Sequence, residues 1–113
     1  MPRLLINDGF TLDRKIKTGY DYPEFSVKYR PAMPEEVYQY GEDMASASTG
    51  AAKNKVFSKF VAKHLVGWDV EDEKGLAEIT DVNVGRLPHA LHGPLADVIT
   101  GYARKELEAD AKN

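Results

Sequence analysis

The stretch that decides the fold begins at Ala52, ends at Leu65 and reads AKNKVFSKFVAKHL. Apolar side chains recur in it at spacings of three and four residues, the period of a helix that buries one face. Lysines repeat every fourth position on the other side, at Lys55, Lys59 and Lys63. The pattern predicts a long amphipathic helix that Gly67 ends.

A second helix is expected just before it. Pro34 suits the first helical position, and the carboxylates of Glu35 and Glu36 meet the positive end of the helix dipole. Its apolar positions recur at helical spacing as far as Met44, so we predict a helix to about Ala47.

A third main helix is expected near the end of the chain. Gly93-Pro94 indicates a break, and apolar residues follow it at helical spacing from Leu95 to Tyr102. Thr80 is a good N-cap residue, so a short helical turn before Pro88 is also predicted.

Strands are expected mainly in the first thirty residues. Leu4 and Ile6 precede the turn-forming residues 7–9, and apolar positions from Phe10 to Ile16 follow them, which predicts a hairpin. Residues 25–29 alternate apolar and polar side chains as a half-buried strand does. Residues 68–70 and 76–79 resemble a short extended pair around the charged turn 71–75.

The length of 113 residues favours a single domain spanning residues 1–113. We expect an α+β, mainly helical fold with three main helices and a small N-terminal β-hairpin or sheet. Residues 1–30 form the β-rich part, residues 31–107 the helical part and residues 108–113 a polar tail.

Composition excludes several kinds of chemistry. The chain has no cysteine, which rules out disulfides, thiolate nucleophiles and sulfur-ligated metals. A net charge of −3 argues against a protein devoted to nucleic acid. The N-terminus lacks the apolar stretch of a signal peptide and no run reaches membrane-spanning length, so we expect a cytoplasmic protein with no membrane partner.

No catalytic or metal-binding constellation is recognisable. His89 and His92 have no carboxylate at a familiar ligand spacing, and His64 is expected to be partly buried and hydrogen-bonded. The acidic residues 69–73 do not follow the order of a calcium loop and are interpreted as a solvated turn. We therefore predict a protein that is not an enzyme and uses no metal or cofactor.

Protein binding is the better expectation. Tyrosines are concentrated in the first forty residues, and tyrosine is enriched at interfaces. The lysines of residues 53–63, with Arg14, Lys15 and Lys17, are interpreted as solvated surface, although a cationic surface stays open. The candidate partner-binding residues are Tyr29, Tyr38, Tyr40, Phe57, Phe60, Val61 and Trp68.

Several stretches also resemble a known family. They are YRPAMPEEVY at 29–38, AKHLVGWDV at 62–70, ITDVNV at 79–84, RLP at 86–88 and ITGY at 99–102. Over about residues 25–103 the chain is similar to the tail assembly chaperones of long-tailed bacteriophages.

This resemblance implies a non-enzymatic factor that binds the phage tape measure protein, keeps it in solution and recruits tail tube subunits around it. It also implies self-association, a place in the host cell cytoplasm and absence from the mature virion. Many members of the family have a longer form made by ribosomal frameshifting. Two alternatives stay open: a structural virion component, such as a minor tail or connector protein, and a small nucleic-acid-binding module.

Overall fold

A central strand organises the sheet. The computed structural model describes residues 5–6, 9–17 and 21–102, and β2 (Phe25–Tyr29) lies in the middle of a three-stranded antiparallel sheet. Its first, third and fifth residues are buried and the two between them are not, because side chains alternate across a strand. The sequence predicted this strand correctly.

The two outer strands come from distant parts of the chain. β1 (Leu12–Ile16) pairs with β2 over its whole length, with Ile16 opposite Phe25. β3 (Leu65–Trp68) pairs on the other side, with a register shift between Lys28 and Tyr29. The strand order is therefore β1-β2-β3.

Four helices are found within the described residues, which together with the sheet confirms the α+β fold class. α1 (Pro34–Ser46) and α2 (Gly50–His64) form an antiparallel pair, and α3 (Asp81–Gly85) and α4 (His89–Thr100) follow. The hydroxyl of Thr49 accepts the amide of Ala52 at 3.0 Å and begins α2. Thr80 accepts the amide of Asn83 at 3.1 Å, so the predicted cap of α3 is confirmed.

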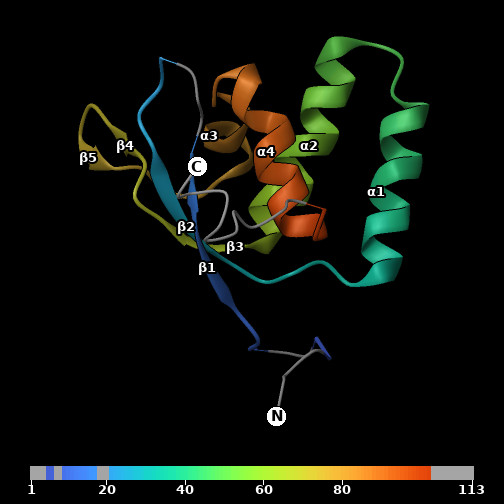
Figure 1. The fold of residues 1–113 in the computed structure, drawn as a ribbon. Helices are drawn as coiled ribbons and strands as arrows, with labels where there is room; N and C mark the ends of the chain where they lie inside the picture. Colours follow the sequence, from blue (N-terminus) through green and yellow to red (C-terminus); the bar gives the residue numbers. More distant parts are fainter. Residues whose placement is uncertain (1–4, 7–8, 18–20, 103–113) are drawn as a thin grey trace, which may run out of the picture.

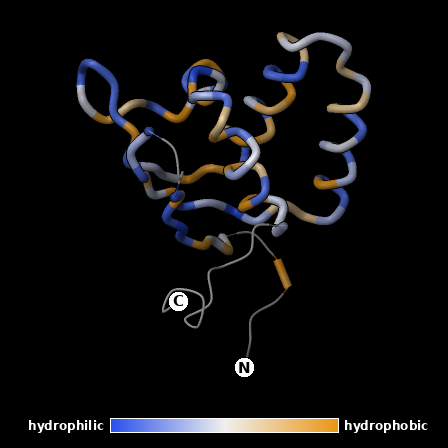
Figure 2. Tube along the Cα trace, turned by 45° about the horizontal axis from the view of Figure 1, so that its top comes forward, coloured by the Kyte–Doolittle hydropathy of each residue, from blue (hydrophilic) through white to orange (hydrophobic). Residues whose placement is uncertain are grey.

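The core lies between one face of the sheet and the helices α2 and α4. Val27 contributes from β2, and Val61, Leu95 and Ile99 from the two helices are fully buried. α1 stands outside this layer, on the far side of α2 and α4 from the sheet (Figure 1). Figure 2 shows hydrophobic segments in the middle of the molecule, whereas the turn between the short strands β4 (Glu71–Asp72) and β5 (Gly75–Leu76) is hydrophilic.

The predicted N-terminal hairpin is wrong in its pairing. Ile6 belongs to no strand, while Leu4, Asn7 and Asp8 lie outside the described residues. The hairpin in the structure joins β1 to β2 instead. The reason is burial, since this pairing places Ile16 beside the apolar positions of β2 on the covered face.

The predicted break at Gly93-Pro94 is also wrong. α4 begins at His89, after Pro88, and continues through Pro94. Proline removes one helical hydrogen bond, but the same helix buries side chains on the sheet side on both sides of Pro94, including Leu91 and Leu95. The expected extension of this helix toward Leu107 and the tail 108–113 lie outside the described residues.

α2 ends earlier than the predicted stop at Gly67. It stops at His64, and Leu65 already belongs to β3, so the helical part of residues 31–107 contributes a strand to the sheet. The backbone amide of Leu65 still bonds to the carbonyl of Val61. The predicted extended pair forms as β4 and β5, but its strands lie closer together than predicted, because residues 71–72 and 75–76 of the predicted turn themselves pair.

Candidate functional site: a groove between α1 and α2

An open groove runs along one side of the α1–α2 pair. It has a volume of about 610 Å³ and is lined from both helices. Five half-buried apolar side chains line it: Tyr40, Ala47, Ala52, Val56 and Phe60. Apolar side chains that the fold leaves partly uncovered in a concave surface are typical of a binding site.

The middle of this groove is set by an aromatic stack. The rings of Tyr40 on α1 and Phe60 on α2 have centroids 4.2 Å apart and an interplanar angle of 17°. Burial, with a smaller contribution from the charge of Asp97, raises the pKa of Tyr40, so its phenol stays protonated at neutral pH. The stack fixes the separation of the two helices at this level.

A charged network closes one end of the groove. Oε2 of Glu36 lies 3.0 Å from Nζ of Lys63 and 3.1 Å from Nε2 of His64. Oε1 of Glu36 accepts the backbone amide of Met33 at 2.9 Å. The network therefore joins the start of α1 to the end of α2.

The electrostatics of this network follow from its geometry. Burial alone would raise the pKa of Glu36, but the hydrogen bonds from Met33, Lys63 and His64 outweigh it and lower the pKa to about 2. Nδ1 of His64 lies 2.7 Å from the carbonyl oxygen of Phe60. Both ring nitrogens of His64 thus lie within hydrogen-bond distance of an acceptor oxygen.

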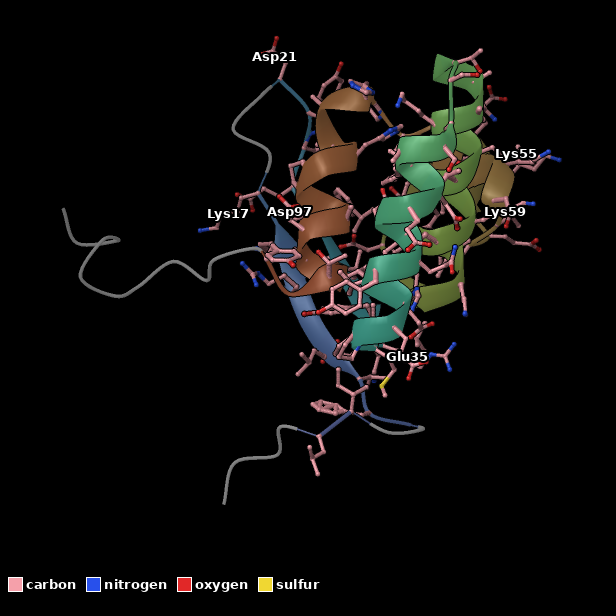
Figure 3. All side chains as sticks on the ribbon, turned by 90° about the vertical axis from the view of Figure 1, so that its right-hand side faces the viewer. Lys17, Asp21, Glu35, Lys55, Lys59 and Asp97 are labelled. Atoms are coloured by element: carbon pink, nitrogen blue, oxygen red, sulfur yellow. The ribbon has the colours of Figure 1, made fainter. Side chains whose placement is uncertain are left out.

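The two sides of the groove carry opposite charge. From α1 the groove is lined by the carboxylates of Glu36 and Asp43, and this helix has neither lysine nor arginine. From α2 it is lined by Lys55, Lys59 and Lys63, and this helix has neither aspartate nor glutamate. Lys55 and Lys59 are exposed, and Figure 3 shows both projecting from α2 on the side away from α4.

A second cavity lies on the other side of α1. It has a volume of about 680 Å³ and is bounded by α1, α2 and α4. His92 stacks on Phe57 with centroids 4.0 Å apart, and its Nε2 donates to the carbonyl of Leu87 at 2.9 Å. Burial lowers the pKa of His92. The imidazole therefore serves packing, and the described residues hold no group of three or more metal-ligating side chains.

The candidate partner-binding residues divide by burial. Four belong to the core, where the fold uses their surface: Tyr29, Phe57, Val61 and Trp68. Tyr40 and Phe60 line the groove, and Tyr38 is 71% exposed on the outside of α1. Sequence reasoning missed Val56 and Glu36 as site residues, although Val56 lies one helical turn from Phe60 on the same stripe.

The basic residues do not form one surface. Figure 3 places Lys17 on the opposite side of the molecule from Lys55 and Lys59. Lys15 lies 3.6 Å from Glu24 in an ion pair on the sheet. Lys55, Lys59 and Lys63 are therefore a local feature of the groove, and Lys15 and Lys17 do not extend it.

No protein-family model matches this chain, and neither does any curated protein or solved structure. Within residues 5–6, 9–17 and 21–102, no helix has the length and apolar character needed to cross a membrane.

Proposed function

We propose that this protein is a tail assembly chaperone of a long-tailed bacteriophage. It binds the tape measure protein without catalysing a reaction, keeps it in solution and helps to recruit tail tube subunits. It acts in the host cytoplasm, self-associates and is absent from the mature virion. The resemblance of residues 25–103 to that family suggests the partner, and the groove between α1 and α2 supports a protein-binding role.

The single observation that carries the proposal is the shape and lining of this groove. Its α2 side extends from Ala52 to His64, which is about 18 Å along a helix axis and matches about three turns of a bound helix. Helix-in-groove recognition uses apolar anchors repeated every three or four residues. Val56 and Phe60, one turn apart, offer contact points at that spacing.

Co-expression with the tape measure protein of the same gene cluster tests the function. We expect this protein to keep the tape measure protein soluble and to co-purify with it. Val56→Asp places a charge in the groove and should reduce the soluble complex about tenfold or more, since an unpaired charge in an apolar contact is costly. The matched control is Val82→Asp, because Val82 is 69% exposed on α3.

Thermal unfolding of each variant separates lost binding from lost folding. A wild-type protein that folds while its partner stays insoluble contradicts the chaperone function. Detection of this protein in purified virions also contradicts it and favours a structural component of the particle.

A further inference from the structure

The charge pattern of the groove is complementary to itself. One side of it is the acidic helix α1 and the other is the basic helix α2. A uniformly acidic or basic partner would meet attraction on one side and repulsion on the other. A partner that suits both sides needs a basic side opposite α1 and an acidic side opposite α2, and a second copy of the same helix pair has that arrangement.

We propose that, in the absence of a client, the groove is covered by the α1–α2 groove of a second copy, in a dimer whose two-fold axis runs parallel to the helices. Such an axis places α1 of each copy against α2 of the other, in an antiparallel four-helix arrangement. An axis across the helices would place acidic α1 against acidic α1, which like-charge repulsion disfavours.

The heights of the charges along the helices agree with this pairing. Glu36 contacts His64 and Tyr40 stacks on Phe60. The helices are antiparallel, so moving one residue toward the C-terminus of α1 corresponds to moving one residue toward the N-terminus of α2. Asp43 therefore lies at the height of Phe57, between Lys55 and Lys59. A two-fold axis parallel to the helices keeps these heights, so Asp43 of one copy lies level with the lysine pair of the other.

These groups are available for the pairing. Asp43 is exposed and accepts a hydrogen bond from Gln39 at 2.9 Å, which leaves carboxylate lone pairs free for another donor. Lys55 and Lys59 are exposed and form no ion pair with the described residues. Pairing the grooves would also cover the half-buried apolar residues between the charged sides, including Val56 and Phe60.

The inference rests on the proposed function for self-association and for the identity of the client, which would displace the second copy from the groove; it adds the surface and the symmetry of the contact. Self-association would then keep the apolar surface covered until a client helix arrives.

Sedimentation equilibrium of the purified full-length chain, with no client present, tests the dimer. We expect the wild type to dimerise, and Lys59→Glu and Asp43→Lys each to raise the dimer Kd on the order of tenfold or more, because each replaces attractive pairs by repulsive ones at both symmetric contacts. An equimolar mixture of the two variants should associate more tightly than either variant alone, since position 43 of each copy then faces an opposite charge at position 59 of the other, while Lys55 is unchanged. The double variant should likewise associate more tightly than either single variant.

Lys74→Glu, with the same charge change in the β4–β5 turn, is the matched control and should leave the Kd unchanged. Circular dichroism confirms that each variant folds. A wild type that is monomeric at about 100 µM, a dimer that both single variants leave intact, or a mixture that fails to restore association each overturns the proposal. A monomeric wild type would also remove self-association from the proposed function, whereas a dimer that both single variants leave intact overturns only the groove as its interface. Binding of the tape measure protein is decided separately by the co-expression test.

Discussion

At the scale of single residues, Glu36 connects the start of α1 to the end of α2 through its charge. Its pKa is about 2 in the fold against an ordinary value of 4.5. A carboxyl group whose pKa is lowered by folding stabilises the protein above its ordinary pKa, and this contribution is lost as the pH falls toward the folded value. The stabilisation should therefore disappear between pH 4.5 and pH 2.

We expect Glu36→Gln to remove this pH dependence. Between pH 4.5 and 2, the free energy of unfolding of the wild type should fall by about 1 kcal/mol more than that of the variant, since solvent screens a partly exposed network. Urea denaturation at a series of pH values measures the difference. Glu35→Gln is the control because Glu35 is exposed and forms no ion pair with the described residues. A Glu36→Gln profile parallel to that of the wild type contradicts this role.

The same network shows what sequence reasoning can reach at this scale. It predicted that His64 is partly buried and hydrogen-bonded, and the residue is 3% exposed with both ring nitrogens engaged. It did not predict Glu36 as the partner, because the two residues are 28 positions apart. Only the antiparallel return of α2 brings them together.

At the scale of elements, the contact of α3 with α2 depends on a glycine. A Cβ atom at Gly85 would lie 2.7 Å from Oγ of Ser58, which is too close for two non-bonded atoms. That hydroxyl is held by a hydrogen bond of 2.6 Å to the carbonyl of Asn54. The side chain of Asn54 in turn donates to the carbonyl of Gly85 at 3.2 Å. The helices therefore approach closely where the glycine permits it.

We expect Gly85→Ala to lower the free energy of unfolding by about 1 to 3 kcal/mol, because the added methyl group overpacks this contact. Ser58→Ala removes the hydroxyl, so the double variant should lose less stability than the two single variants together. Gly41→Ala is the control: Gly41 is exposed inside α1, nothing lies within 4 Å of its added Cβ, and alanine should stabilise α1 by about 0.5 to 1 kcal/mol. Urea denaturation of the four variants measures these effects, and additive losses would contradict a direct clash.

Elements were predicted well where local chemistry decides their limits. Thr80 caps α3 and the alternating pattern of residues 25–29 forms β2, as expected. The predictions failed where tertiary burial decides. α4 continues through Pro94 because its apolar side packs on the core. Leu65, predicted as the end of the helix that begins near Ala52, belongs to β3 because β2 offers it hydrogen-bond partners.

At the scale of the whole molecule, α1 is the helix least integrated into the fold. Its apolar positions predicted an inner face, yet none of its residues is buried, whereas α2 and α4 each contribute several. The sequence could not predict the groove, because an apolar stripe does not reveal how much of it a neighbouring element covers. The stack of Tyr40 on Phe60 and the Glu36 network attach α1 to α2. The groove and the second cavity lie on the two sides of α1 and leave both sides accessible.

This arrangement predicts that α1 opens without unfolding of the core. Native-state hydrogen exchange of a dilute sample should give α1 amides an opening free energy at least about 2 kcal/mol below that of α2 and α4, because detaching α1 exposes little fully buried surface. If copies associate through the groove, protection of α1 should rise with protein concentration in the wild type and not in Lys59→Glu. Exchange of α1 amides only through global unfolding would contradict the first expectation. In that case α1 unfolds only together with the core. A client would then bind to the groove as it stands in the folded structure, without detachment of α1.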